Sequence, residues 1–194
     1  MAKKFSKFLL STLPKKYDQF WNHASKVNFP PLNIKLENLL LGEDFTLKIT
    51  DFDLSGFVSD TNYFSKGTKN YRAPEMLNTD YKDGRAVDIY SAGVILFALK
   101  TGGISPYIEG ELYHGIDLYQ LLTQNNKEFW KKHAEIQKVS PLEFSSEFKM
   151  LVNGMLKQDP EQRLTLREIK NSRWYNGPVF SKQELQSYLK KYVR

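Results

Sequence analysis

The fold is decided by residues 31–53, which have the sequence PLNIKLENLLLGEDFTLKITDFD. Within this stretch, two short apolar segments at residues 39–41 and 47–49 are separated by a connection that contains Gly42 and Asp44. Short apolar segments joined by Gly and Asp are typical of a β-hairpin. The sequence therefore predicts a small hairpin with polar side chains next to both of its outer ends.

Helical patterns dominate the sequence that follows the hairpin. Residues 85–100 are almost continuously apolar and are followed by Gly102 and Gly103, which is typical of a central helix that ends at a glycine. Thr165 and Glu168 have the spacing of a capping box, which marks the start of another helix. We predict a mainly α fold with further helices over residues 117–124, 147–156 and 165–171.

Three regions are predicted along the chain. Residues 1–29 contain amphipathic helical patterns, residues 30–176 form the main domain, and residues 177–194 form a helical tail. The lysines among the apolar residues near the N-terminus leave an interfacial or targeting segment as the alternative to a packing helix. The apolar residues at positions 55–71 follow neither the helical nor the strand period, so this stretch is predicted to form a long loop. Long ordered loops are usually functional.

The composition excludes several classes of protein. The chain has 194 residues, 41% of them hydrophobic, a formal net charge of +6 and no cysteine, so disulfides and thiolate zinc sites are excluded. Its basic residues are spread along the chain, so we expect no nucleic-acid binding. The longest apolar run is about half the ~20 residues that cross a bilayer, so we expect no transmembrane segment and a cytoplasmic protein.

Polar motifs follow one another in an order that points to a family. They are Asn33-Ile34-Lys35-Leu36-Glu37-Asn38, Asp51-Phe52-Asp53, Gly67-Thr68, Ala73-Pro74-Glu75, Asp88-Ile89-Tyr90-Ser91-Ala92-Gly93, and Asp159-Pro160 followed by Arg163. This series resembles the C-terminal lobe of eukaryotic protein kinases, and within them serine/threonine kinases of the calmodulin-dependent or SNF1-related type. The resemblance covers roughly residues 30–176 and implies a helical bundle with a small β-hairpin.

The resemblance also implies how a nucleotide would be held. Asp51 would be the main carboxylate ligand of a Mg²⁺ ion on the phosphates of ATP, and Asn38 would offer an oxygen to a second metal ion. Lys35 would steady the transferring phosphate, and Thr68 would bridge Lys35 and the catalytic residue at position 33. Phosphoryl transfer needs this kind of positioning and charge neutralisation more than it needs covalent chemistry.

Three charged residues are expected to be structural. Glu75 and Arg163 should form a buried ion pair, because either charge would be costly if it were buried alone. Asp88, early in an apolar helix, should accept hydrogen bonds from the loop around Leu32 and Asn33.

The sequence departs from the family pattern at four positions of this site, because Pro31-Leu32-Asn33 stands in place of His-Arg-Asp and Asp53 stands in place of a glycine. Asn33 replaces the catalytic aspartate, and an amide cannot take up the proton of a substrate hydroxyl. Leu32 stands where many kinases have an arginine that docks a phosphate on the loop, so phosphorylation at Ser59, Thr61, Tyr63 or Ser65 would lack that partner. Asp53 replaces the glycine of Asp-Phe-Gly, where it restricts the loop, recruits a cation or is a plain surface residue.

The residues before position 30 contain no glycine and hence no glycine-rich phosphate loop, and no N-terminal β lobe is recognisable. We therefore expect a pseudokinase that holds Mg²⁺ and ATP weakly or not at all and binds protein partners at the face where that lobe would lie. The alternative is an active serine/threonine kinase whose N-terminal lobe is supplied elsewhere. A third hypothesis, a nonfunctional fragment, predicts poor folding.

Overall fold

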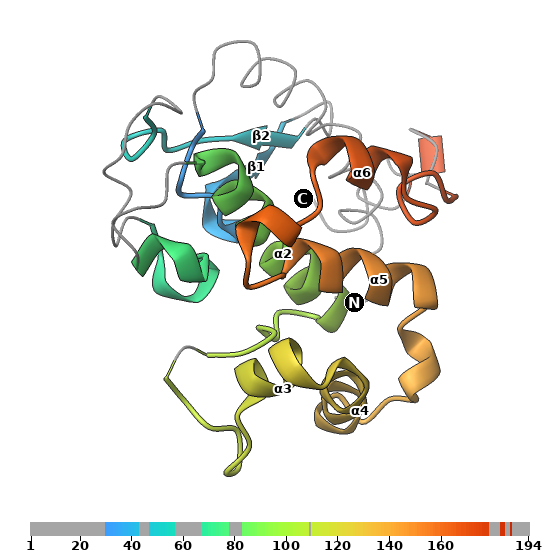
Figure 1. The fold of residues 1–194 in the computed structure, drawn as a ribbon. Helices are drawn as coiled ribbons and strands as arrows, with labels where there is room; N and C mark the ends of the chain where they lie inside the picture. The colour runs from blue at the N-terminus through green and yellow to red at the C-terminus, as the bar shows by residue number, and fades with distance from the viewer. Residues whose placement is uncertain are drawn as a thin grey trace.

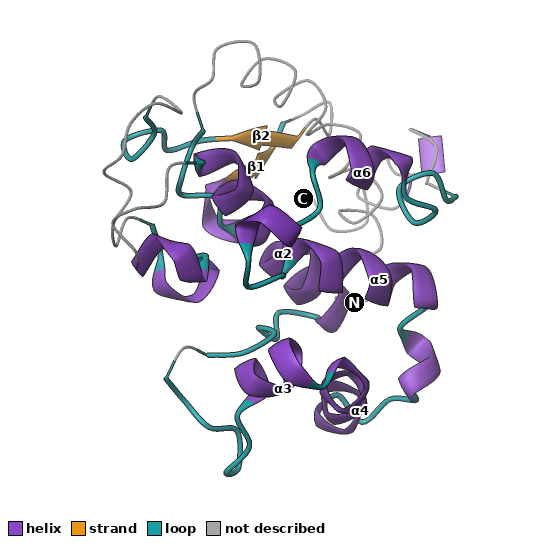
Figure 2. Cartoon of the chain, viewed as in Figure 1, coloured by secondary structure: helices purple, strands orange, loops and turns teal. Residues whose placement is uncertain are grey.

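The computed structural model describes residues 30–42, 47–56, 67–77, 83–108, 110–178, 183, 184 and 187. In this part of the chain, α-helices predominate beside one two-stranded antiparallel sheet (Figures 1 and 2). The prediction of a mainly α fold with a small hairpin is confirmed. The helices predicted within residues 1–29 lie outside the described residues, as do most of the tail predicted at 177–194 and the four hydroxyl residues at positions 59–65.

The hairpin forms where the apolar segments predict it. A 3₁₀ helix, η1 (Leu36–Asn38), leads into β1 (Leu39–Leu41), which pairs with β2 (Leu47–Ile49). In this register Leu39 lies opposite Ile49. The pairing brings the residue before β1 and the residues after β2 to the same end of the hairpin, where the candidate site lies.

The central helix, α2 (Gly84–Thr101), is buried along most of its length. Its first turn is capped by the Asp83 side chain, which accepts a hydrogen bond from the Arg85 N–H, and it ends at Gly102 in the left-handed conformation, with φ of 76°. A helix that is apolar all round needs neighbours on every side. The remaining elements therefore pack around α2 (Figure 1).

The helix α5 (Ser146–Met155) crosses α2 at close range. A Cβ atom at Gly93 in α2 would lie 2.9 Å from Met155 Cβ and 2.9 Å from Leu156 Cδ2. Both distances are shorter than van der Waals contact, so a glycine at position 93 permits the close approach of the two helices.

Two helices cover the other end of α2, namely α3 (Leu118–Gln124) and α4 (Asn126–Ile136). The rings of Phe129 and Trp130 in α4 lie 5.7 and 5.6 Å from the ring of Phe97, centroid to centroid. The sequence pattern did not predict α4. Its buried stripe includes His133, and counting this residue as polar makes the apolar stripe too short to identify a helix.

The remaining described elements are short. They are the 3₁₀ helices η2 (Lys69–Tyr71), η3 (Pro74–Leu77), η4 (Pro141–Glu143) and η5 (Pro160–Gln162), and the helix α6 (Leu166–Asn171). The capping box predicted for Thr165 and Glu168 is present at the start of α6. Among the described helices, none combines the length and the apolar character that crossing a bilayer requires.

Candidate functional site

The loop that enters the site is held by the central helix. The backbone N–H of Leu32 donates a hydrogen bond of 3.0 Å to Asp88 Oδ1, and Leu32 adopts a φ of 61°, which is rare for a residue with a side chain. The second carboxylate oxygen, Oδ2, is buried and has no partner among the described residues. Pro31, the preceding residue, has no N–H to offer. Burial therefore raises the pKa of Asp88 well above its ordinary value.

Asn38 and Asp51 are brought together by the hairpin. The Thr50 N–H donates to the Asn38 carbonyl at 2.9 Å, which extends the pairing of β1 and β2 by one step. The Asn38 side-chain Nδ2 donates to Asp51 Oδ2 at 3.0 Å and to the Asn33 carbonyl at 2.9 Å. Both of its N–H groups are thus in use, which leaves the Asn38 Oδ1 as the atom that can accept or ligate.

Asn33 faces the same carboxylate. Its Nδ2 donates a hydrogen bond of 2.7 Å to Asp51 Oδ2, so this oxygen accepts from two amides at once. Its Oδ1 accepts from the hydroxyl of Thr68 at 3.4 Å, a long and weak bond. The amide group at position 33 therefore acts as a donor toward Asp51 and as an acceptor toward Thr68.

Lys35 completes the group from the other side. Its ammonium Nζ donates to the Thr68 hydroxyl at 3.2 Å, which places Thr68 between Lys35 and Asn33 as the resemblance implies. The neighbouring Gly67 has a φ of 82°, and a Cβ there would lie 2.8 Å from the Leu32 carbonyl oxygen. Glycine is required at position 67 for both reasons, and its presence allows the loop that carries Thr68 to approach Asn33.

The donor set has a limited capacity for a metal ion. No group of three or more His, Cys, Asp or Glu side chains with metal-binding geometry occurs in the described ranges. The oxygens that fit Mg²⁺ are Asp51 Oδ1 and Asn38 Oδ1, since Asp51 Oδ2 already accepts two amide N–H groups. The two residues would hold Mg²⁺ together with phosphate and water oxygens. Asp53 is exposed in the turn that follows Asp51.

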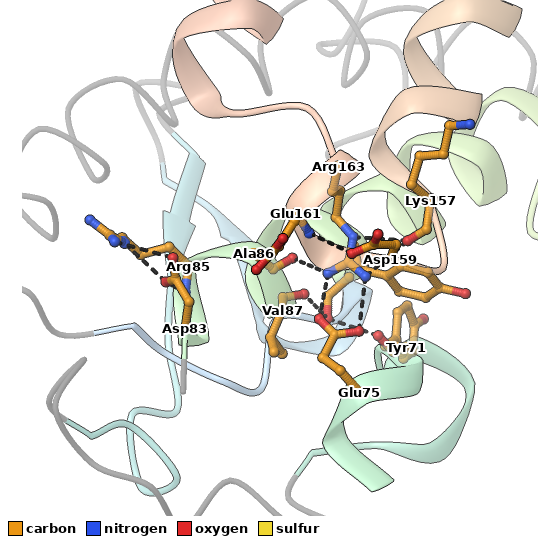
Figure 3. A network of polar contacts seen from close by, with 12 residues as sticks. Tyr71, Glu75, Asp83, Arg85, Ala86, Val87, Lys157, Asp159, Glu161 and Arg163 are labelled. Carbon is orange, nitrogen blue, oxygen red and sulfur yellow. Dashed lines mark hydrogen bonds and ion pairs between the residues drawn. The ribbon is translucent and has the colours of Figure 1, made fainter. Parts of the chain in front are cut away.

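A buried ion pair fixes the loop that follows Thr68. Arg163 Nη1 lies 2.6 Å from Glu75 Oε1, and Nη2 lies 2.9 Å from Oε2 (Figure 3). The guanidinium also donates to the carbonyls of Ala86 and Lys157, and it lies 4.9 Å from the ring centroid of Tyr90. The pair that the sequence predicts is present, and it joins η3 to the start of α2 and to the loop before α6.

One contribution to this loop was not predicted from sequence. Ser91 Oγ in α2 donates a hydrogen bond of 2.8 Å to the Tyr71 carbonyl, which ties η2 to the central helix. A serine in an apolar helix is a signal that a backbone carbonyl lies opposite it, because a buried hydroxyl needs a partner.

A family model described as a protein kinase domain matches residues 23–175. "CBL-interacting protein kinase 28" of Oryza sativa subsp. japonica is 34% identical over 152 residues, which cover 76% of this chain and 32% of that protein. "Probable serine/threonine-protein kinase MARK-B" of Dictyostelium discoideum is 37% identical over 147 residues, which cover 74% of this chain and 19% of that protein. "SNF1-like protein kinase ssp2" of Schizosaccharomyces pombe is 32% identical over 146 residues, which cover 74% of this chain and 23% of that protein.

The matched part of the chain includes the whole candidate site, from the loop at Leu32 to the ion pair at Arg163. The chain spans about a third or less of the length of these curated relatives. With a match over residues 23–175 and the helical fold described above, the chain belongs to the protein kinase domain family and is a distant relative of serine/threonine kinases of the CBL-interacting, SNF1-like and MARK types.

Proposed function

We propose that this chain is a pseudokinase module that acts by binding another protein and that holds Mg²⁺ and ATP weakly or not at all. The observation that carries the proposal is the hydrogen bond of 2.7 Å from Asn33 Nδ2 to Asp51 Oδ2. At the position where the kinases it resembles place a proton acceptor, this chain has a donor that is already paired with the metal-binding carboxylate.

The chemical consequence follows from the amide group. An asparagine side chain does not accept a proton at neutral pH, so Asn33 cannot act as the general base for a substrate hydroxyl. Loss of a general base typically lowers the rate by about 10²- to 10⁴-fold. We infer that any phosphoryl transfer by this chain is slow for this reason alone.

Metal binding should also be weaker than the two ligands suggest. A Mg²⁺ ion near Asp51 competes with two amide N–H groups that already satisfy the Oδ2 of that carboxylate.

A separate consequence concerns phosphorylation of the loop that follows Asp51. Leu32 is apolar and buried in the core, so it cannot bind a phosphate group on that loop as an arginine would.

We propose that the partner binds at the surface around Leu40 and Phe52, which we call the hairpin face. Leu40 on β1 and Phe52 after β2 are exposed large apolar residues next to the candidate site. Large apolar side chains that gather on one face mark an interaction surface more often than single ones do. This face is the one that the N-terminal lobe covers in the kinases that the chain resembles.

A second function remains supported by a specific observation. Four polar side chains from separate segments converge on one point. Lys35 Nζ donates to the Thr68 hydroxyl at 3.2 Å, and Asn38 Nδ2 donates to Asp51 Oδ2 at 3.0 Å. This arrangement favours an ATP-dependent serine/threonine kinase whose N-terminal lobe is supplied by another chain or by a further part of a longer protein. Mg²⁺ and ATP would then be its cofactors.

A thermal-shift titration with ATP and Mg²⁺ separates the two functions. A ligand at 100 times its Kd stabilises a protein by about 2.7 kcal/mol, which is readily seen as a rise in Tm. The pseudokinase proposal predicts no rise at millimolar ATP. A rise that is absent in the Asp51→Ala variant, together with incorporation of labelled phosphate into a basic peptide, would favour the kinase.

Binding at the hairpin face has its own test. Candidate partners identified by cross-linking are titrated with the wild-type chain, with Leu40→Asp and with Met150→Asp, a matched change at an exposed residue of α5. The proposal predicts weaker binding only for Leu40→Asp. Equal binding by all three proteins would contradict the hairpin face as the partner site.

A further inference from the structure

We propose that Ser140 is a phosphorylation site for a separate kinase that modifies serines followed by proline, and that Lys149 binds the phosphate once it is attached. Ser140 lies in the connection between α4 and α5, residues 137–145, and Lys149 lies near the start of α5 (Figure 1). Neither residue belongs to the candidate site or to the hairpin face. The inference therefore does not depend on whether this chain itself transfers phosphate.

The structure distinguishes between two candidate serines. The chain contains two Ser-Pro sequences, Ser105-Pro106 and Ser140-Pro141, and no Thr-Pro. An enzyme that selects a proline after the acceptor serine has to contact the proline ring, so the ring must be accessible. Pro106 is buried, and the Ser105 hydroxyl donates to the Tyr107 carbonyl at 2.7 Å. Ser140 and Pro141 are both exposed, which makes Ser140 the accessible acceptor.

The backbone around Ser140 suits a segment that enters the active site of another enzyme. Ser140 has φ of −65° and ψ of 141°, the extended conformation that a following proline favours. Residues 137–145 contain one short 3₁₀ helix, η4, in which Leu142 is 88% exposed. Exposed connections of this kind are where enzymes that act on protein chains gain access. The hydroxyl is therefore accessible without unfolding of α4 or α5.

A lysine lies close to the position of the attached phosphate. Lys149 Nζ donates a hydrogen bond of 3.1 Å to the Pro141 carbonyl. The Ser140 Oγ accepts a hydrogen bond of 3.3 Å from the N–H of the same peptide unit, that of Leu142. The two side chains thus flank one peptide unit. The flexible stem of Lys149 has the length to bring its ammonium group to a phosphate on Ser140.

The positive charge of Lys149 is available for this role. Lys149 takes part in none of the ion pairs between the described residues. Its ammonium group has three N–H donors, and the bond to the Pro141 carbonyl uses one of them. Along the chain, Lys138 precedes Ser140 by two residues and Glu143 follows it by three, so their opposite charges largely offset each other. Lys149 therefore decides whether the site attracts a phosphate.

The proposed modification is a phosphoryl transfer from ATP bound to the separate kinase. The Ser140 Oγ attacks the γ-phosphorus, the bond from that phosphorus to the oxygen bridging the β- and γ-phosphates breaks, and ADP leaves. The hydroxyl proton passes to the base of that kinase. The phosphoserine carries a charge of about −1.5 to −2 at pH 7 and three strong acceptor oxygens. With Lys149 Nζ as a donor to these oxygens, the phosphate ties the connection to α5.

The site is tested by incubating the purified full chain with ATP, Mg²⁺ and a cyclin-dependent kinase as the proline-directed enzyme. Mass spectrometry should find phosphate on Ser140 and none on Ser105. Pro141→Ala should lower the rate at Ser140 by about tenfold or more. Absence of phosphate on Ser140 would overturn the proposal, and a peptide of residues 138–144 tells whether the sequence or the fold excludes the enzyme. Phosphate on Ser140 after incubation with ATP alone would overturn the assignment to a separate kinase.

The role of Lys149 has its own measurement, the Tm of the phosphorylated and unphosphorylated chains in low salt. Phosphorylation should raise the Tm by about 2–4 °C in the wild type and in Lys149→Arg, which keeps the charge, and should not raise it in Lys149→Gln. A fall in Tm, or equal rises in the wild type and Lys149→Gln, would contradict phosphate binding by Lys149. If Lys149→Gln does not fold, the wild type decides, because high salt should abolish a rise that depends on an exposed ion pair.

Discussion

The amide nitrogen of Asn33 lies 2.7 Å from Asp51 Oδ2, and the amide nitrogen of Asn38 lies 3.0 Å from the same oxygen. Two neutral donors thus satisfy one carboxylate oxygen without any metal ion. This relationship links a single change in sequence, asparagine for aspartate at position 33, to two effects. The site loses its general base, and the Asp51 carboxylate has less need of Mg²⁺ to balance its charge.

Asn33→Asp should make the site depend on a cation. A carboxylate at position 33 would lie about 3 Å from Asp51, and two like charges at this distance either share a proton or require a cation between them. In EDTA the variant should melt below the wild type. Addition of Mg²⁺ should raise its Tm more than that of the wild type, which thermal melts in matched buffers would measure.

Asn33→Ala serves as the control for that comparison. It removes the hydrogen bonds to Asp51 and Thr68 without adding a charge, so its Tm should fall and should respond to Mg²⁺ no more than the wild type does. An equal response to Mg²⁺ in the Asp and Ala variants would show that the pairing of positions 33 and 51 is not what limits metal binding.

Removing one partner of the buried ion pair should be costly. Glu75→Gln leaves the Arg163 charge buried without its carboxylate, and breaking such a pair typically costs about 3–5 kcal/mol. The double variant Glu75→Gln/Arg163→Met should lose less than the sum of the two single variants. Urea unfolding of the four proteins gives the coupling energy.

The exposed pair of Arg85 and Asp83, at 3.0 Å, provides the comparison. Arg85→Ala should cost no more than about 1 kcal/mol, because a surface ion pair gains little over solvation. Similar losses of unfolding free energy in Arg85→Ala and Glu75→Gln would contradict the expectation that breaking the buried pair costs more than breaking an exposed one.

His133 should make the protein less stable in acid. Its Nε2 donates to the Pro106 carbonyl at 2.8 Å, and its Nδ1 is buried without a partner among the described residues, so burial lowers its pKa from 6.5 to about 4. A lowered pKa means that the neutral form stabilises the fold above pH 6.5. This stability is lost as the pH falls toward 4, by about 3 kcal/mol in total.

The contribution of His133 is measured by urea unfolding between pH 7 and 4 in the wild type and in His133→Gln. Because other carboxyl groups also take up protons as the pH falls toward 4, the difference between the two proteins is the relevant quantity. That difference should shrink as the pH falls. A difference that stays constant with pH would mean that His133 does not titrate in this range.

Asp88 should show the opposite dependence on pH. Its pKa is raised in the folded state, chiefly by burial, so its contribution to stability is largest below 3.8 and declines as the pH rises toward the folded pKa. Asp88→Asn keeps an oxygen for the Leu32 N–H and cannot ionise. The wild type should therefore lose stability relative to Asp88→Asn between pH 4 and 7 in urea unfolding, and a parallel course would contradict this.

Much of the fold follows from local sequence patterns. The hairpin was predicted at residues 39–41 and 47–49, where it occurs, and the central helix at 85–100 agrees with α2 to within one residue at each end. The central helix has a long apolar run with clear end signals, and the strands are short apolar segments joined by a connection that contains Gly and Asp. The helix α4 was missed because His133 is buried within it, and a sequence pattern does not distinguish a buried neutral histidine from an exposed one.

The site was predicted less completely. Motif order predicted that Lys35, Thr68, Asn38 and Asp51 lie together, but not that Asn33 donates to Asp51. This contact requires a φ of 61° at Leu32 and of 65° at Asp51, which residues with side chains rarely adopt. Such conformations are imposed by tertiary contacts, here in part by Asp88, and local propensity does not reveal them.

The most direct test of the central claim is transfer of labelled phosphate from ATP and Mg²⁺ to a basic peptide by the purified chain, with Asp51→Ala assayed in parallel. The account predicts that the wild type incorporates no more phosphate than Asp51→Ala does. Transfer at an ordinary kinase rate of about 1–100 per second that is abolished by Asp51→Ala would contradict it.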